Sequence, residues 1–314
     1  MMMTRNEAAL WLTERDNYCI LTHRKPDGDT AGSAAALCLG LRQLGKKAVI
    51  LKNPELTPRY AFLHAGLTVD APEEDMTLVS VDVAAPNMLP KAFEPYRDRI
   101  ALRIDHHGTA TSFTPEELVD GESASCAELI CDLVTLLGIQ MDKSIANAVY
   151  VGLSTDTGCF RFANTTAHSF LVAAVCAGNG ADIHALNQKF FETNTRSKLR
   201  MQAWIVENMK VFAEGKLAVV AIPKSVEEAI GVTEDDMDNI SSFPRTVAGV
   251  CMAATLRETK DGDVKLSVRA IPGYDATVVT GAFGGGGHRG AAGATLKMSL
   301  KDAALAVEKA MLEL

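Results

Sequence analysis

Short apolar runs alternate with helix-like stretches along the first part of the chain, and most of these runs end abruptly in polar residues. Apolar runs too short for a helix predict strands, and the longer periodic or alanine-rich stretches predict helices. The predicted strands are residues 18–22, 47–52, 77–81 and 100–104, and the predicted helices are residues 6–15, 30–44, 57–65, 123–137, 143–153 and 166–177. This alternation predicts an α/β fold with a mainly parallel sheet flanked by helices.

The pattern changes in the second part of the chain. Residues 185–212 read as helical and more charged, and strands then dominate. Three strands are predicted at residues 216–222, 247–256 and 264–270, with helices at residues 233–240 and 300–313. We therefore expect an N-terminal domain at residues 1–190, a helical linker at 191–214 and a smaller mixed α/β domain at 215–314, with the active site in the cleft between the domains.

Histidine and aspartate side chains follow three of the predicted strands. They are His23, Asp27, Asp29, Asp82, Asp105, His106 and His107. Ligands of open α/β sheets gather beyond the carboxyl ends of the strands, so these side chains are expected to converge. Each has an ordinary alternative: Pro-Asp-Gly-Asp is a common turn, a strand-end aspartate is often a cap, and one histidine of a pair can simply bind Asp105.

Asp156 adds a further carboxylate, in a polar cluster at residues 154–158 that follows an apolar helix. Alone it would be taken for a loop aspartate. From this residue and the strand-end groups we draw a ligand inventory of two imidazoles and four carboxylates without a thiolate, a set that suits manganese or a similar divalent ion better than structural zinc. One ion does not need so many ligands, so two ions that share a carboxylate are expected.

Residues 283–293 contain four consecutive glycines followed by His288 and Arg289. No strand is predicted before them, no suitable acidic residue follows, and Gly-Lys-Ser/Thr is absent, so neither a dinucleotide fingerprint nor a P-loop fits. Glycines without a Cβ let a phosphate or sugar approach backbone N–H groups closely. We expect a ligand-binding loop here, with a mobile linker as the alternative.

Composition narrows the class of protein. With 314 residues and 47% hydrophobic content the chain can bury a large core, and no apolar run has the length of a membrane span or the form of a signal peptide. Seven cysteines without Cys-x-x-Cys spacing favour a reducing cytoplasm over disulfides or a zinc-thiolate cluster. A net charge of −8 argues against binding duplex nucleic acid, but it allows a small anionic substrate.

The polar motifs resemble, in order, the four motifs of the DHH phosphoesterases. They are His-Arg-Lys-Pro-Asp-Gly-Asp at residues 23–29, Asp82, Asp-His-His at residues 105–107 and Ser-Thr-Asp-Thr-Gly at residues 154–158. Residues 283–293 resemble the Gly-Gly-Gly-Gly-His signature of the DHH-associated C-terminal domain. The length and the two-domain plan most resemble the bacterial nanoRNase branch, the bifunctional oligoribonucleases and phosphatases of 3′-phosphoadenosine 5′-phosphate (pAp).

The resemblance implies roles for individual residues. One Mn²⁺ ion would be held by His23, Asp27 and Asp82, and a second by Asp29, Asp82, His106 and Asp156, giving two ions per chain with Asp82 as the bridge. Asp105 would orient a neighbouring histidine, and His107 would contact the scissile phosphate. In the C-terminal domain the implied substrate-binding residues are Arg269, Gly285, Gly286, Gly287, His288 and Arg289, with Arg245 and Arg257 as weaker candidates.

The implied activity is hydrolysis of short oligoribonucleotides to mononucleotides and of pAp to AMP, by two-metal activation of water in a cytoplasmic homodimer. Cys159 and Ala270 depart from the family pattern, which leaves substrate preference open. The alternatives are a manganese-dependent inorganic pyrophosphatase, a RecJ-type exonuclease, a phosphodiesterase of pApA or cyclic dinucleotides and, outside enzymes, a nucleotide-binding regulator.

Overall fold

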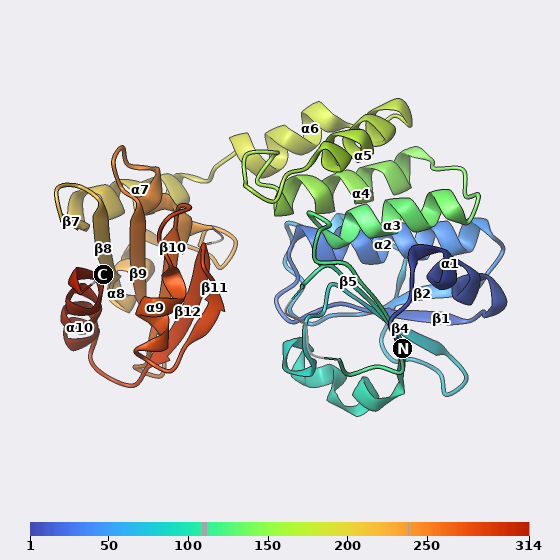
Figure 1. Ribbon diagram of the computed structural model, residues 1–314, viewed down its shortest axis with the longest axis horizontal. Coiled ribbons are helices and arrows are strands. Elements are labelled where there is room, and N and C mark those ends of the chain that lie inside the picture. The colour runs from blue at the N-terminus through green and yellow to red at the C-terminus, as the bar shows by residue number, and fades with distance from the viewer. Residues whose placement is uncertain (109–111, 238, 314) are drawn as a thin grey trace. The chain divides into compact units, whose positions relative to one another are not determined.

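The computed structural model describes residues 1–108, 112–237 and 239–313. The chain divides into two compact units, Met1–Thr193 and Asn194–Leu314, each with its own sheet (Figure 1). Among the helices of the described ranges, none has both the length and the apolar character needed to cross a membrane. That residues 1–190 and 215–314 act as catalytic and substrate-binding domains stays a prediction.

A six-stranded parallel sheet forms the centre of the larger unit, with its strands in the order β3-β2-β1-β4-β5-β6. The strands are β1 (Tyr18–Leu21), β2 (Ala48–Leu51), β3 (Thr68–Val69), β4 (Thr77–Val81), β5 (Ile100–Asp105) and β6 (Glu116–Val119). The predicted parallel sheet is thus confirmed. The strand order reverses between β1 and β4, and the loops that leave the carboxyl ends of these two strands therefore run in opposite directions and open a crevice.

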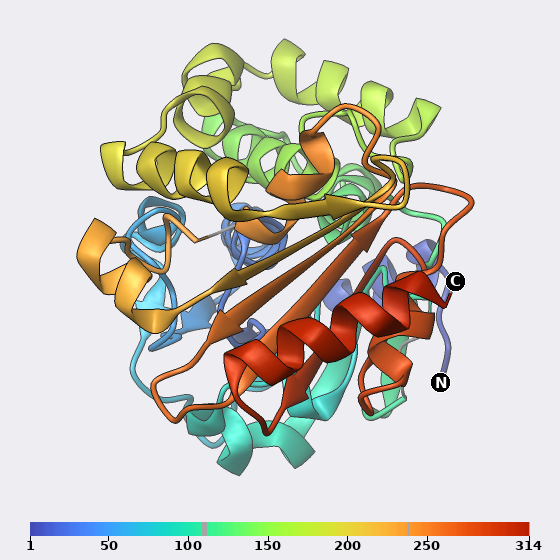
Figure 2. The same ribbon diagram turned by 90° about the vertical axis from the view of Figure 1, so that its left-hand side faces the viewer.

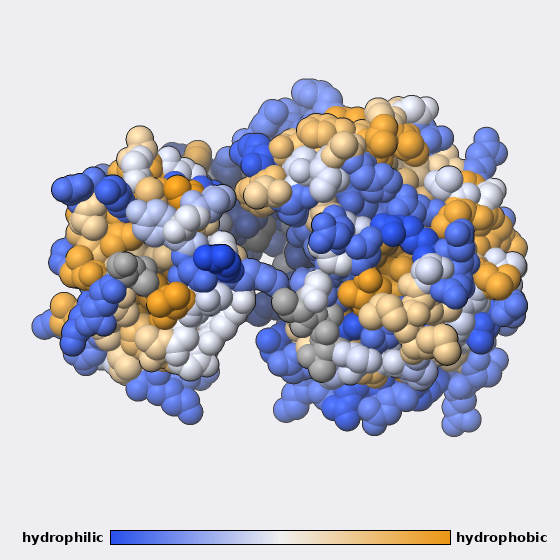
Figure 3. Space-filling model, in the orientation of Figure 1, coloured by the Kyte–Doolittle hydropathy of each residue, from blue (hydrophilic) through white to orange (hydrophobic). Residues whose placement is uncertain are grey.

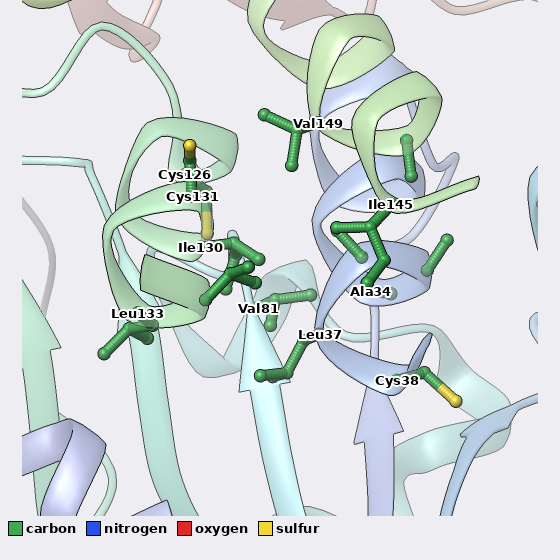
Figure 4. Close-up of a cluster of buried hydrophobic side chains, with 14 of the residues drawn as sticks. Ala34, Leu37, Cys38, Val81, Cys126, Ile130, Cys131, Leu133, Ile145 and Val149 are labelled. Carbon is green, nitrogen blue, oxygen red and sulfur yellow. The ribbon is translucent and has the colours of Figure 1, made fainter. Parts of the chain in front are cut away.

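Helices cover one face of this sheet. They are α1 (Arg5–Glu14), α2 (Gly28–Gln43) and α3 (Cys126–Leu136), with α4 (Lys143–Asp156), α5 (Ala167–Gly178) and α6 (Ile183–Asn187) packed beyond them. Figure 4 shows Leu37, Ile130 and Val149, from three different helices, in one cluster of buried side chains with Val81 of β4. The apolar faces of these helices and the sheet form one continuous core.

The opposite face of the sheet is covered by short helical turns, η2 (Pro86–Met88) and η3 (Lys91–Arg99). Leu89 and Phe93 pack there against Leu21 and Leu78, which point away from the helical layer. Because apolar side chains are covered on both sides, these strands read as continuous hydrophobic runs rather than as alternating patterns.

Glycines let α2, α3 and α4 approach one another closely. A Cβ on Gly32 of α2 would collide with the carbonyl oxygen of Ala148 in α4. A Cβ on Gly152 of α4 would lie 2.6 Å from the Cβ of Ala127 and 2.8 Å from Oδ1 of Asp29. Backbone packing at this distance tolerates no side chain, so the glycines bring the start of α2 and the start of α3 beside the end of α4.

Helix α4 is longer than the sequence predicts, because its polar end stays helical. Thr155 Oγ1 donates to the carbonyl of Val151 at 2.8 Å, and Thr157 Oγ1 donates to the carbonyl of Leu153 at 2.7 Å. These bonds satisfy the hydroxyls within the helix. Asp156 therefore lies in the last turn of α4 and not in a loop.

The smaller unit holds a mixed sheet with the strand order β11-β12-β10-β9-β8-β7, in which only β8 and β9 are parallel. Its strands are β7 (Lys210–Phe212), β8 (Leu217–Ile222), β9 (Met252–Glu258), β10 (Val264–Ala270), β11 (Gly286–His288) and β12 (Ala291–Leu296). Its helices are α7 (Arg196–Asn208), α8 (Lys224–Ile230), α9 (Ala276–Gly281) and α10 (Leu300–Leu312). Figure 2 shows α10 lying across one face of this sheet. The predicted mixed α/β architecture is confirmed.

Several element predictions in this unit were wrong. Residues 185–212 are not one helical stretch: a π-helical turn, Gln188–Glu192, follows α6, and β7 follows α7. The predicted strand at 247–256 begins only at Met252, since Gly249 has a φ of +89°. The described residues of the predicted helix 233–240 form turns that lead into a 3₁₀ segment, Ile240–Thr246, while position 238 lies outside the described residues.

Part of the predicted linker belongs to the core of the smaller unit. Met201 and Ile205 of α7 are buried against Val220 and Ile222 of β8. The amphipathic pattern of this helix therefore reflects packing on the second sheet.

One exposed apolar area lies on the larger unit, where Figure 1 draws α5 and Figure 3 shows orange and tan atoms. Phe170 and Leu171 of α5 are 58% and 64% exposed. The ring of Phe170 stacks on Phe160 with centroids 5.3 Å apart, so one side of this helix is held against the segment that follows Asp156.

Buried His64 makes the larger unit sensitive to acid. Its Nε2 donates to the carbonyl of Ala31 at 3.0 Å, and burial lowers the pKa of His64 below its ordinary value of 6.5. Because the folded pKa is depressed, the contribution of the neutral imidazole is fully present above the unfolded pKa. It is lost as pH falls from there toward the folded pKa. The free energy of unfolding should therefore fall between neutral pH and about pH 5, and less so in His64→Gln.

The measurement is urea unfolding at both pH values, followed by the fluorescence of Trp11 in a Trp204→Phe background so that only the larger unit reports. Equal acid sensitivity with and without His64 would contradict this account.

Candidate metal centre

His23 lies buried directly after β1, and its ring orientation is fixed. Its Nδ1 lies 2.7 Å from the carbonyl of Arg24, while Asn53 Nδ2 donates to the carbonyl of His23 at 2.9 Å. Nε2 therefore points the other way, 3.5 Å from Asp27 Oδ1 and 3.4 Å from Asp82 Oδ2. A ring whose Nδ1–H donates to a carbonyl presents a free lone pair at Nε2, as a metal ligand requires.

The start of α2 supplies two carboxylates with different surroundings. Asp27 caps the helix and accepts the N–H of Asp29 at 3.0 Å. The carboxylate of Asp29 is buried at the N-terminus of α3, where it accepts the N–H groups of Cys126 at 2.6 Å and Ala127 at 2.9 Å, and Ser33 Oγ at 3.2 Å. The dipole of α3 favours the ionised form of this carboxylate.

Asp82 occupies the position where the chain turns at the end of β4. Its φ of +57° lies in the left-handed region, and its N–H donates to the carbonyl of Ile104 at 2.9 Å. The side chain is 2% exposed, and Oδ1 is buried without a hydrogen-bond partner among the described residues. Backbone strain and an unsatisfied buried oxygen both destabilise a fold, so this carboxylate has the features of a cation ligand.

Asp105 is the last residue of β5, His106 and His107 follow it, and the three side chains turn in different directions. Asp105 Oδ1 lies 2.7 Å from His107 Nδ1 and also accepts the N–H of His106 at 2.8 Å. The other histidine is oriented by a carbonyl, with His106 Nδ1 lying 3.2 Å from the oxygen of Ser123. Its Nε2 then faces the carboxylates and lies 3.7 Å from Asp156 Oδ2.

The structure brings all six residues predicted as metal ligands into two neighbouring groups. The first is His23, Asp27 and Asp82, and the second is Asp29, His106 and Asp156; within each group the ligand atoms lie within 4.8 Å of one another. Oδ2 of Asp82 faces His23 of the first group, and Oδ1 lies 3.6 Å from Nε2 of His106 in the second. His107, to which the sequence assigns another role, also lies within reach, with Nδ1 3.6 Å from Asp82 Oδ1.

Burial and repulsion among the carboxylates together disfavour their ionised forms in this site. Burial raises the pKa of Asp29 and of Asp156 well above the usual range, and the nearby charge of Asp82 adds to both shifts. Burial disfavours the charged form of His107, but its hydrogen bond to Asp105 and the charge of Asp82 outweigh this effect and raise its pKa to about 9. Oxygen and imidazole donors without a thiolate fit divalent cations of the manganese type, which would relieve this repulsion.

Asn164 is a part of this site that the sequence does not reveal. Its Nδ2 donates to the carbonyls of Ala124 at 2.9 Å and Asp156 at 3.2 Å, and so joins the end of α4 to the start of α3. Neither contact leaves a sequence signal, because both acceptors are backbone atoms.

In the smaller unit, the register of three neighbouring strands places Arg269 and His288 at corresponding positions, one strand apart on either side of β12. Ala291 of β12 lies between them, paired with Arg269 of β10 on one side and with His288 of β11 on the other. Cross-strand partners share a face, so the two polar side chains flank the small Ala291 at a Cα separation of about 10 Å. Burial and the charge of nearby Arg245 lower the pKa of Arg269. Two neighbouring guanidinium groups and an imidazole favour an anionic ligand.

The glycine-rich segment is a hairpin strand and not the open loop that we expected. Gly286 to His288 pair with β12, and Gly285 N donates to the carbonyl of Thr280 at 2.9 Å. A Cβ on Gly287 would lie 2.6 Å from the carbonyl oxygen of Ala291. Gly285 and Gly287 therefore permit close backbone contact within the protein, while Gly286 borders open space.

Two of the predicted cations have acidic partners within the smaller unit. Arg289 Nε lies 3.1 Å from Asp275 Oδ2, and Arg257 Nε lies 2.8 Å from Glu227 Oε1. These pairs fasten the hairpin to α9 and β9 to α8. Arg257 and Arg289 are thus engaged by carboxylates, and a role of Arg269 in binding a substrate anion stays a prediction.

Known proteins share both the motifs and the fold. The DHH family N-terminal domain matches residues 17–153, and the DHHA1 domain matches residues 214–313. The bifunctional oligoribonuclease and PAP phosphatase NrnA of Thermus thermophilus is 34% identical over 283 residues, which are 88% of this chain and 83% of that protein.

Two solved structures share the fold. An exopolyphosphatase-related protein from Bacteroides fragilis aligns with a TM-score of 0.84 at 22% identity, over 98% of this chain and 96% of that one. RecJ from Thermus thermophilus, in complex with Mn²⁺, aligns with a TM-score of 0.59 at 15% identity, over 98% of this chain and 53% of that one. The resemblance seen in the motifs is thereby confirmed, and the chain belongs to the DHH family, with a DHH domain followed by a DHHA1 domain.

Proposed function

We propose that this DHH-family hydrolase is a manganese-dependent phosphoesterase that cleaves short oligoribonucleotides to mononucleotides and pAp to AMP. The observation that carries the proposal is the position of Asp82, whose two oxygens face two separate groups of ligands. The likeness to a bifunctional oligoribonuclease and PAP phosphatase over most of both chains supports the choice of substrates.

One set of side chains would bind the Mn²⁺ ions, and His107 with Asp105 would supply a proton for a hydrogen bond. His23, Asp27 and Asp82 would hold one Mn²⁺, and Asp29, Asp82, His106 and Asp156 would hold the other. When bound, two such ions lower the pKa of a coordinated water and neutralise charge on the phosphoryl group. His107, oriented by Asp105 and with a pKa of about 9, would be protonated at neutral pH and able to donate a hydrogen bond to a phosphate oxygen.

The smaller unit would bind the part of the substrate that does not react. Arg269, Arg245 and His288 suit a terminal phosphate, and the alanine between them leaves room for a base or sugar. A net charge of −8 and this small cationic area favour a short single strand over a duplex. We place the enzyme in the cytoplasm, where its seven free cysteines would stay reduced, and infer from the family resemblance that it is a homodimer.

Product analysis tests the proposed substrates. With Mn²⁺ the enzyme should release AMP from pAp and mononucleotides from a 5′-phosphorylated diribonucleotide, and a chelator should abolish both reactions. Cleavage of inorganic pyrophosphate alone would assign the chain to the pyrophosphatase alternative. Cleavage of pApA or a cyclic dinucleotide in preference to both substrates would select the phosphodiesterase alternative.

Asp82→Asn tests the shared ligand. Asparagine tolerates the left-handed backbone at this position and preserves the shape of the side chain, so the variant should fold. It should lose binding of both Mn²⁺ ions, and turnover should fall at least about 100-fold. Isothermal titration with Mn²⁺ and initial rates measure the two effects.

Asp70→Asn is the control, since this carboxylate is 88% exposed and pairs with Lys52 on the surface. Two bound ions in Asp82→Asn would rule out the shared carboxylate.

Arg269→Gln tests the substrate anion site. Loss of a charge-assisted hydrogen bond to phosphate should raise KM for pAp about 10- to 100-fold, with little change in kcat or in Mn²⁺ binding. The matched control is Lys301→Gln, because Lys301 is an exposed residue of α10, an element that does not carry the proposed anion site. An unchanged KM in Arg269→Gln would remove this residue from the binding site.

A further inference from the structure

Arg103 is the largest fully buried side chain of the protein, with 1% exposure. It lies in the middle of β5, where a parallel sheet normally holds apolar residues. Its Nη2 lies 3.1 Å from Oε2 of Glu117, its cross-strand partner on β6. A buried ion pair is a weak source of stability, because desolvation of both charges offsets their attraction. The presence of this pair inside the sheet therefore calls for another explanation.

Arg103 and Asp105 are two residues apart on one strand, so their side chains lie on the same face of the sheet. Nη1 of Arg103 lies 4.0 Å from Oδ2 of Asp105 and donates to the carbonyl of Ala84 at 3.2 Å. The guanidinium group also lies over the ring of Phe113, 5.1 Å from its centroid. The cation is thus held on several sides and directed toward Asp105.

Glu117 holds this arrangement from β6. Its Oε1 accepts the N–H of Phe113 at 3.0 Å and that of Thr114 at 3.3 Å, while Oε2 faces Arg103. One carboxylate therefore anchors both the guanidinium group and the segment that enters β6. Rotation of Arg103 away from Asp105 would break the ion pair with Glu117.

The two oxygens of Asp105 have different surroundings. Oδ1 binds Nδ1 of His107 at 2.7 Å and the N–H groups of His106 and His107. Oδ2 is buried, has no hydrogen-bond partner among the described residues, and faces Arg103. The position of Asp105, and through it the imidazole of His107, thus depends on a cation behind it.

We propose that Arg103, held by Glu117, is a positioning residue that fixes the Asp105 carboxylate and thereby the orientation of His107 toward the substrate phosphate. The role of His107 at phosphate rests on the proposed function. The contacts among Glu117, Arg103, Asp105 and His107 do not.

The test separates positioning from stability by removing both charges of the pair. Arg103→Met alone leaves Glu117 buried without its partner, so it should lower the melting temperature. The double variant Arg103→Met/Glu117→Gln leaves neither charge but keeps an amide oxygen for the N–H groups of Phe113 and Thr114, so it should recover most of that loss. In both variants kcat for pAp should fall about 10- to 100-fold, with KM and Mn²⁺ stoichiometry little changed.

Two further variants sharpen the kinetic result. Arg103→Lys keeps a cation and should retain more of kcat than Arg103→Met. Arg42→Met is the control within the same unit, because Arg42 bonds only to the carbonyls of Ala48 and Gly66 in the described contacts. If kcat returned together with the melting temperature in the double variant, the ion pair would be structural and the proposal would be overturned.

A readout without turnover distinguishes failure of this inference from failure of the proposed function. In ¹⁵N-histidine-labelled protein, the Nδ1 signal of His107 should shift in the double variant, while that of distant His64 stays in place. A shift in a protein that cleaves no phosphoester would refute the proposed function and support the positioning role. An unchanged His107 signal would overturn the positioning role whatever the activity.

Discussion

Repulsion among buried carboxylates is the constraint on which the larger unit depends. Asp29, Asp82 and Asp156 come from three different elements, and each is directed toward the same small volume. Such groups do not stay ionised together without a cation, and burial with mutual repulsion raises the pKa of Asp29 and Asp156 accordingly. On the proposed function, bound Mn²⁺ ions would relieve this repulsion, so metal binding and the final geometry of the site would be coupled.

The close packing of α2, α3 and α4 is linked to the position of the carboxylate of Asp29. Asp29 receives the N-terminus of α3 only because Gly152 lets α4 pack without a side chain between them. The left-handed backbone of Asp82, by contrast, is a local cost. It destabilises an ordinary α/β sheet and becomes reasonable if the carboxylates hold a ligand.

On the proposed function, the two units would divide the chemistry of one anionic substrate. The larger unit collects carboxylates and imidazoles, which would bind cations and handle protons. The smaller unit carries Arg269 and His288 on either side of Ala291, with Arg245 near Arg269, and this set would suit a phosphate group. Arg103 belongs to neither set, since it acts within the sheet on the carboxylate that orients His107.

The sequence by itself determined the parallel sheet, the family and the histidine and aspartate residues predicted to bind metal, because apolar strand runs ending in histidine or aspartate are local patterns. It did not determine that Asp156 is helical, that the glycines form a hairpin strand, or that Arg289 pairs with Asp275. These depend on hydrogen bonds and ion pairs between residues that the tertiary structure brings together. The sequence did not indicate that Arg103 is buried either, since an arginine within a strand is exposed or buried according to what packs over it. The tertiary structure brings the carboxylate of Glu117 on β6 close to this side chain, in addition to that of Asp105 on its own strand, and these two carboxylates balance its buried charge.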